Sequence, residues 1–380
     1  MPEIKNLKKT AKRILKAVKN NERIIIYGDA DMDGVSSVII MKECIGNLGA
    51  RISDVYFPDR EKDGYGITEK GLSCLKKHAP ALLLVLDCGI TNFKEIKKAK
   101  KIGFEVVLIE HHEVLNKLPE ASIIVNPKQK GDKYPFKYFA TVGIVFKLTE
   151  LILKKKMKKG LRNNFLELAA LATIADMMPR VQDNLEIITE GLNSLKSSWR
   201  PGIQALLELE PRINRINSLL NIRDAENNLP AAYRLLTSTD KKEAKKLAKR
   251  LLEKGIEKRQ KIKEITDDIE ERIFGREKDP IIFEGSLEWD LIFLGVVASI
   301  LSQKYQKPVF LYKKGREEKN KEASSPGSVR SPAGLNTVEA MKKCFSSDLI
   351  TFGGHAQASG FRIKNKGLEK FKNCLSNYFK

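Results

Sequence analysis

Four short apolar runs, each followed at once by polar side chains, restrict the fold of this 380-residue chain more than any other feature of its sequence. The runs cover residues 23–27, 81–86, 105–109 and 123–125, and segments with helical apolar spacing, such as residues 35–45, lie between them. Runs that are apolar at every position indicate strands that are covered on both faces. We therefore expect an α/β protein built on a parallel sheet.

Polar residues that could form a site follow these predicted strands. In an open parallel sheet, ligands bind at the carboxyl ends of the strands. Three aspartates follow the first run, one follows the second and a histidine pair follows the third, while a helical stretch at 165–175 ends at a further aspartate. The candidate residues at this edge are Asp29, Asp31, Asp33, Asp87, His111, His112 and Asp176.

The first aspartate cluster favours a divalent cation. Asp29, Asp31 and Asp33 crowd three carboxylates into five residues, and their repulsion would keep one or more protonated unless a cation neutralised them. The alternative is an Asx-rich turn whose Asp side chains, Asp33 among them, cap the helix that starts near Gly34. Carboxylates with an imidazole suit Mn²⁺ or Mg²⁺, and clustered aspartates can bridge two ions that activate water for attack on phosphorus.

The charge balance predicts a polyanionic partner. The chain has 69 lysines and arginines against 48 acidic residues, a formal net charge of +21. Such an excess favours nucleic acid first and an anionic lipid surface second. A solvated basic surface without a specific partner is the alternative.

Composition also bears on location. No apolar run reaches the ~18 residues that a membrane span needs, and the basic N-terminal segment lacks the apolar region of a secretory signal. The five cysteines contain no CxxC pair, which argues against a zinc ribbon and against a disulfide framework. We expect a soluble protein of a reducing cytoplasm, with no membrane partner.

We predict three segments along the chain: a domain at 1–239, a helical connector at 240–275 and a smaller α/β domain at 276–380. The connector is highly charged, with apolar residues three or four apart and an interruption at Gly255, which indicates a long, exposed pair of helices. In the last domain we expect strands at 281–284 and 308–312, a helix at 294–305 and a polar loop at 313–328. A glycine-rich segment follows at 351–360.

This second domain contains a weaker candidate site. The glycines of Gly353–Gly354–His355 free backbone N–H groups to approach a phosphate, and His355 could add a side-chain contact. Arg330 is a possible partner for the same anion. Taken singly, these residues are more simply a turn and a surface arginine.

Together, these motifs resemble those of the DHH phosphoesterase superfamily, and within it the RecJ-like single-strand nucleases, including the archaeal ones. The resemblance covers most of the chain. The motifs that carry it are, in order, Asp29-Ala-Asp31-Met-Asp33-Gly34, Leu86-Asp87-Cys88-Gly89, Glu110-His111-His112, Asn126-Pro127, Ala172-Thr-Ile-Ala-Asp176, Ser328-Val-Arg330-Ser331 and Phe352-Gly353-Gly354-His355.

The resemblance implies a role for each matching residue. Asp29, Asp31, Asp87, His111 and Asp176 match the positions that hold two Mn²⁺ ions, with Mg²⁺ as a possible substitute. His112 matches the histidine that contacts the scissile phosphate, with Asp33 beside the ions. Substrate binding is implied for Arg330, Ser331, Gly353, Gly354 and His355.

One departure from the family concerns the triplet that gives it its name. Glu110 stands where the family has aspartate, and changes in groups that support metal ligands can cost 10–100-fold in affinity or activity. All the implied ligands are present, so we expect an active enzyme.

The resulting prediction is a metal-dependent phosphodiesterase, a RecJ-like exonuclease that hydrolyses single-stranded DNA, RNA or both from an end and serves in DNA repair or replication. Replication proteins such as GINS or a single-strand-binding protein are possible partners. One alternative is a nanoRNase or nucleotide phosphatase of the same superfamily. The other is a replication-associated scaffold with weak or no nuclease activity.

Overall fold

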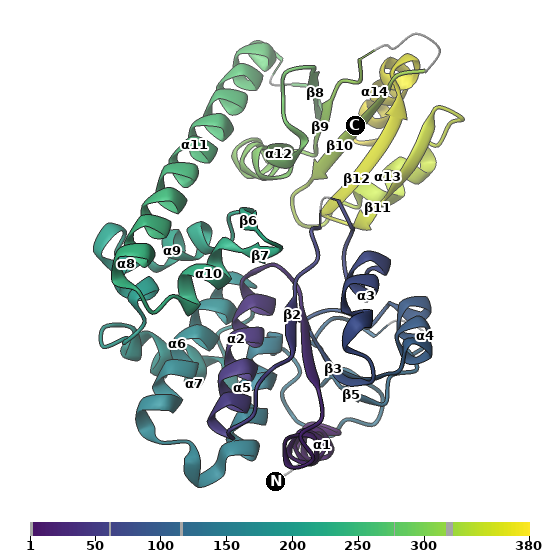
Figure 1. Ribbon diagram of the computed structural model, residues 1–380. Helices are drawn as coiled ribbons and strands as arrows, with labels where there is room; N and C mark the ends of the chain where they lie inside the picture. Colours follow the sequence, from purple (N-terminus) through teal and green to yellow (C-terminus); the bar gives the residue numbers. More distant parts are fainter. Residues whose placement is uncertain (1–2, 61, 115–116, 277, 317–321) are drawn as a thin grey trace. The chain divides into compact units, whose positions relative to one another are not determined.

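The computed structural model describes residues 3–60, 62–114, 117–276, 278–316 and 322–380 of the chain (Figure 1). They form two compact units, Met1–Gly255 and Ile256–Lys380. Each unit has its own five-stranded sheet. The predicted domain boundaries after residues 239 and 275 stay predictions.

The N-terminal unit alternates strands and helices in its first half and is mainly helical in its second. Its elements are α1 (Leu7–Lys19), β1 (Ile24–Gly28), α2 (Met32–Asn47), β2 (Asp54–Tyr56), α3 (Glu69–Leu75), β3 (Ala81–Leu86), α4 (Phe93–Ile102), β4 (Phe104–Ile109), β5 (Ile123–Val125), α5 (Thr141–Leu153), α6 (Lys159–Ala175), α7 (Gln182–Leu195), α8 (Pro201–Leu209), α9 (Ile213–Leu220), β6 (Ala225–Glu226), β7 (Leu229–Pro230) and α10 (Ala231–Thr237).

The sheet of this unit is parallel throughout, in the order β2-β1-β3-β4-β5, and confirms the predicted fold class. Alternate residues of each strand enter two separate cores. Ile26 and Leu84 pack with the helices α1, α2, α5 and α6, while Ile25 and Leu83 pack with α3 and α4 on the opposite face. Burial of both faces explains why β1 and β3 carry no charged residue, whereas β4 has one, Glu105, at a half-buried position.

The strand register aligns the carboxyl ends of the strands. Gly28 pairs with Leu86, Leu86 pairs with Ile109, and Ile109 pairs with Val125. The next residue of each strand therefore lies along one edge of the sheet. This edge carries the candidate site described below.

The connector is one continuous helix, α11 (Lys241–Ile273), and not the predicted pair. Gly255 lies within it. A glycine inside a helix costs only about 1 kcal/mol, which the many strong helix formers on either side offset. Although α11 is long, it is charged, and within the described ranges no helix combines the length and the apolar character that crossing a membrane requires.

The C-terminal unit has a mixed sheet between two layers of helices. Its elements after α11 are β8 (Ile282–Ser286), α12 (Leu291–Tyr305), β9 (Val309–Lys313), β10 (Ser324–Arg330), α13 (Thr337–Lys343), β11 (Leu349–His355), β12 (Ala358–Lys364) and α14 (Leu368–Tyr378).

The strand order in this sheet is β11-β12-β10-β9-β8. Helices α11 and α12 pack on one face, at β8 and β9, and helices α13 and α14 cover the other. The predicted polar loop at 313–328 is partly wrong, because its last residues belong to β10. One face of this strand is fully buried and the other is half-buried, and small and polar residues fit the half-buried positions.

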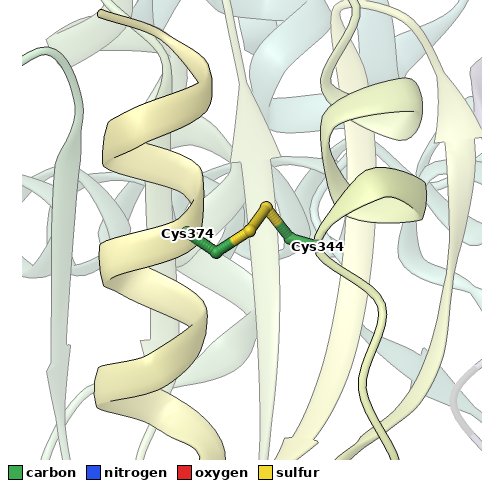
Figure 2. The surroundings of a disulfide bond; sticks show 2 residues. All are labelled: Cys344 and Cys374. Atoms are coloured by element: carbon green, nitrogen blue, oxygen red, sulfur yellow. A yellow bond between two sulfur atoms is a disulfide. The ribbon is translucent and has the colours of Figure 1, made fainter.

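A disulfide joins Cys344 to Cys374 in this unit, contrary to the expectation from cysteine spacing (Figure 2). Cys344 ends helix α13 and Cys374 lies in α14, and their Cα atoms are 5.8 Å apart, within the range for a disulfide. The two cysteines are 30 residues apart, so a search for short CxxC spacings misses them.

Replacing Cys344 with serine should destabilise the C-terminal unit, because closing a loop of 30 residues limits the unfolded chain. We expect a loss of roughly 3 kcal/mol in the free energy of unfolding, measured in urea under oxidising conditions. The exposed, unpaired Cys74, replaced in the same way, is the control. Equal stability of the Cys344→Ser variant and the oxidised wild type would contradict the bond.

Candidate metal centre

Three carboxylates lie at the aligned ends of the central strands. The backbone ladder continues one residue past the strands, since the Asp29 amide donates to Leu86 O, the Asp87 amide to Ile109 O and the Glu110 amide to Val125 O, at 3.0–3.3 Å. The side chains of all three residues are buried. Asp87 has a positive φ of 62°, the left-handed conformation that bulky residues rarely adopt.

The start of helix α2 adds two more carboxylates with different partners. Asp31 is the N-cap of α2 and accepts from the Gly34 amide at 3.1 Å. Asp33 instead accepts from the amides of Thr141 and Val142, at 2.7 and 2.8 Å. The proposed cap of α2 by Asp33 is therefore wrong. Asp33 binds the first turn of α5, where unpaired N–H groups and the helix dipole favour an anion.

His111 faces the carboxylates from the next strand end. Its Nε2 lies 3.5 Å from Asp87 Oδ1, 3.5 Å from Asp176 Oδ2 and 3.9 Å from Asp33 Oδ2. Asp176 reaches this position because it ends helix α6. Burial, followed by the charge of His112, lowers the pKa of His111 to about 4, so the imidazole is neutral and Nε2 can offer a lone pair.

These residues form three overlapping groups of possible metal ligands. The first is Asp29, Asp31 and Asp87, the second is Asp33, His111 and Asp176, and the third is Asp87, His111 and His112. Within each group the ligand atoms lie within 4.8 Å of one another. Asp87 and His111 each belong to two groups, as expected of residues that lie between two neighbouring ions. Every metal-ligand candidate from the sequence is thus brought together, while its role stays a prediction.

Burial makes the ionised forms of these carboxylates costly. Burial and the nearby charges of Asp176 and Asp31 raise the pKa of Asp33 well above its usual value. Burial and the charge of Asp33 do the same to the pKa of Asp87. Burial, followed by the charge of Asp31, raises the pKa of Asp176 to about 6. The site therefore lacks positive charge.

One guanidinium supplies part of that charge. Arg60 donates from Nε to Asp29 Oδ1 at 2.7 Å, and its terminal nitrogen contacts Asp29 Oδ2 and, at 2.9 Å, Asp31 Oδ2. Among the described ion pairs, it is the one permanent cation paired with the five aspartates of the ligand groups. Four negative charges remain when all five ionise, which equals the charge of two divalent cations.

The donor atoms fit hard divalent cations. Asp176 Oδ2 is buried and has no hydrogen-bond partner among the described residues, although it points to His111 Nε2. A buried oxygen without a partner is costly unless a ligand binds it. Carboxylate oxygens with an imidazole nitrogen, and no thiolate, suit Mn²⁺ or Mg²⁺.

Glu110 supports His112 and does not turn toward the aspartates. Its Oε2 accepts from the amides of His111 and His112, both at 2.8 Å, and from His112 Nδ1 at 2.9 Å. Burial opposes ionisation of Glu110, yet the hydrogen bond from His112 prevails and lowers its pKa. Burial also opposes the charged form of His112, which would lower its pKa, but the hydrogen bond to Glu110 outweighs burial and raises the pKa of His112.

Three neighbours of the site were missed in the sequence. Arg60 and Tyr65 follow β2, a strand too short to detect from its pattern, and the Tyr65 hydroxyl lies 3.4 Å from His112 Nε2. Thr141 Oγ1 donates to Asp87 Oδ1 at 3.0 Å. The segment from Pro58 to Gly66 contains a signal that could have revealed the first two, since it is polar and rich in glycine, like the other strand ends.

The candidate substrate-binding residues belong to the C-terminal unit. Arg330 ends β10, and Gly353, Gly354 and His355 end β11. Arg330 is half-buried, forms no ion pair with the described carboxylates, and has a pKa that burial lowers. Gly295 of α12 leaves room for the guanidinium, because a Cβ there would lie 3.1 Å from it.

Ser331 follows Arg330, and its amide donates to Gln357 O at 3.1 Å, in the turn between β11 and β12. Gly354 has a φ of 129°, which restricts this position to glycine. The sequence thus predicted a cluster that the register of the sheet brings together, although its role is untested.

Known proteins match both units. Residues 23–173 match the DHH family, N-terminal domain, and residues 279–380 match the DHHA1 domain. The single-stranded-DNA-specific exonuclease RecJ of Bacillus subtilis is 34% identical over 390 residues, which cover 98% of this chain and 48% of that protein. RecJ of Thermus thermophilus is 28% identical over 395 residues, covering 99% of this chain and 54% of that protein. This chain therefore spans about half the length of these two relatives.

Solved structures agree with these matches. A crystal structure of exonuclease RecJ bound to manganese aligns with a TM-score of 0.81 and 25% identity, over 99% of this chain and 94% of the other. RecJ of Thermus thermophilus in complex with Mn²⁺ has the same fold, with a TM-score of 0.79 over 99% of this chain and 55% of the other.

Without metal, Asp176→Asn should stabilise the protein at neutral pH. The pKa of this carboxyl rises from 3.8 in the unfolded chain to about 6 in the folded protein. The free energy of unfolding therefore falls as pH rises through that window. The variant avoids the loss, so in chelator at pH 7.5 its free energy of unfolding should be roughly 1–3 kcal/mol higher. The advantage should shrink as pH falls toward 4.

Asp267→Asn, an exposed aspartate on α11, is the control for the charge change. If the Asp176→Asn variant is no more stable than the wild type at pH 7.5, the claim that the Asp176 carboxylate destabilises the metal-free protein is wrong.

Proposed function

Because this chain belongs to the DHH superfamily and is similar to RecJ over nearly its whole length, we propose that it is a metal-dependent exonuclease of single-stranded nucleic acid. The observation that carries this proposal is the uncompensated charge of the candidate metal centre. Five aspartates meet at one sheet edge, and among the described ion pairs Arg60 is the one permanent cation paired with them. We propose two Mn²⁺ ions there, with Mg²⁺ as a substitute.

The proposed ligands divide into two sets. Asp87 belongs with Asp29 and Asp31, and His111 belongs with Asp33 and Asp176, while a third group that contains Asp87 and His111 links the two sets. When bound, the two ions would activate water and neutralise charge on the phosphodiester. Thr141 holds Asp87 by a hydrogen bond at 3.0 Å, so the shared carboxylate is oriented before any ion arrives.

His112 is the residue that we propose to contact the scissile phosphate. A carboxylate can only accept, so His112 Nδ1 must carry the proton that Glu110 Oε2 receives. Nε2 is then turned away from Glu110, and the half-buried ring leaves it within reach of a substrate. Because Glu110 raises the pKa of His112, the protonated ring is favoured, and Nε2–H can donate to a phosphoryl oxygen.

The C-terminal unit supplies the proposed contacts to the nucleic-acid backbone. Arg330, with no carboxylate partner among the described residues, suits a phosphate, and Ser331, Gly353, Gly354 and His355 lie around it. The net charge of +21 favours the same class of partner. The cytoplasmic location stays a prediction. Binding to GINS or to a single-strand-binding protein also stays a prediction.

A nuclease assay tests the proposal. End-labelled single-stranded DNA and RNA are incubated with the wild type in Mn²⁺, in Mg²⁺ and in chelator. We expect metal-dependent release of mononucleotides, abolished in Asp87→Ala and reduced about 10²–10⁴-fold in His112→Ala, because proton donation by such a group is worth that much. Glu110→Gln should fall between them, about 10–100-fold below the wild type.

The exposed Lys342, replaced with glutamine, is the matched control on a surface helix of the other unit. Release from strands of two to five nucleotides only would favour the nanoRNase reading. Intact binding without hydrolysis of any substrate in either metal would refute the exonuclease and favour the scaffold.

A further inference from the structure

One face of the C-terminal sheet is open over two strands, β12 and β11, beside helix α12. Val309 and Leu311 of β9 pack under α12, and their register partners on β10 are Arg330 and Ser328, so these side chains share that face. The pairing continues across β12 to β11, where Arg330, Ala358 and His355 form one row. Helix α12 packs on β9 and β10, and among the described helices none packs on β12 and β11 on this face (Figure 1).

A smooth floor lies next to this row. Ser328, Gly360 and Gly353 form the second row of the same face, and Gly353 is exposed. A Cβ built on Gly353 would meet no atom within 4 Å, so the space above it is open. A chain can therefore lie across this row without meeting a side chain larger than serine.

The third row carries an arginine that the sequence did not single out. Arg362 of β12 pairs with Pro326 and Thr351, which places it on the open face with Arg330. It is exposed and forms no ion pair with any carboxylate of the described residues. The next basic residue, Lys364, differs because Glu322 neutralises it at 2.7 Å. An exposed arginine without an ion-pair partner, next to glycines, is available to bind an anion such as a phosphate.

The spacing indicates what kind of anion would bind. In the register of β12, Arg362 lies four residues from Ala358, the partner of Arg330, so the two arginines stand about 13 Å apart along the strands. Two successive phosphates of one strand suit this spacing better than one isolated anion. A polyanion with regularly spaced charges can contact both arginines, and the three rows contain no carboxylate to repel it.

We propose that this open face is a track for the backbone of a single strand of nucleic acid, with Arg362 binding a different phosphate of that strand from the one at Arg330. This inference rests on the proposed function, because it takes Arg330 as a phosphate contact. It adds a residue outside the matched motifs and a direction, from the row of Arg330 toward that of Arg362. The Gly353 row is the floor over which the strand passes.

Binding measured in chelator tests the track without requiring hydrolysis. The titrants are a 12-nucleotide labelled single strand and a nucleoside monophosphate, each over a range of salt. Arg362→Gln should weaken binding of the long strand roughly 3- to 10-fold and flatten its slope of log affinity against log salt by about 0.7, the value for one phosphate on a single strand. Arg362→Lys should restore most of the affinity.

Binding of the monophosphate distinguishes the roles of the two arginines. Arg330→Gln should weaken both ligands, whereas Arg362→Gln should weaken the long strand alone. Gly353→Leu provides a second test, because the site has room for a side chain that would then obstruct the track. Lys370→Gln, an exposed lysine on α14 with no described ion pair, is the matched control and should change the affinity by about twofold or less.

The outcomes distinguish the two proposals. A wild type that hydrolyses single strands while Arg362→Gln binds the long strand with unchanged affinity and slope would overturn the track and leave the exonuclease standing. If the wild type hydrolyses no substrate, but the Arg362→Gln variant shows a flatter slope of log affinity against log salt, the track would stand and the exonuclease would be overturned. Equal affinity for poly-glutamate of matched charge would also overturn the track, since it would show a general polyanion surface.

Discussion

The structure depends on the repulsion among five aspartates that the N-terminal unit holds at one sheet edge. Their burial raises the pKa values of Asp33, Asp87 and Asp176, and Arg60 supplies a single compensating charge. Such an arrangement costs stability on its own and persists because the surrounding architecture holds it. The remaining negative charge equals that of two divalent cations, which is why we propose that two such ions bind there.

The architecture that holds them is simple. A parallel register aligns the strand ends, so that Asp29, Asp87 and Glu110 are consecutive along one edge. Helices then add the rest: Asp33 is fixed by the first turn of α5 and Asp176 by the end of α6. Each proposed ligand therefore lies in or within two residues of a strand or helix, which suits a site with defined geometry.

Much of this was predictable from the sequence, because runs that are apolar at every position reveal buried strands and polar residues at their ends reveal the edge. The misses have physical causes. Strand β2 is only three residues long, so Arg60 went unnoticed. Strand β10 is polar at the positions of its less buried face, which made it look like a loop. The Cys344–Cys374 bond depends on two helices meeting in space, which sequence spacing does not report.

The central claim is that the five aspartates and His111 hold two ions that share Asp87. The most direct measurement is calorimetric titration of the metal-free protein with Mn²⁺ at pH 7.5, alongside Asp31→Asn and Asp87→Asn. The account predicts two ions per chain for the wild type, one tight site left in Asp31→Asn, and both sites weakened in Asp87→Asn. A folded wild type that binds one ion or none, or an Asp87 variant that keeps one site intact, would contradict it.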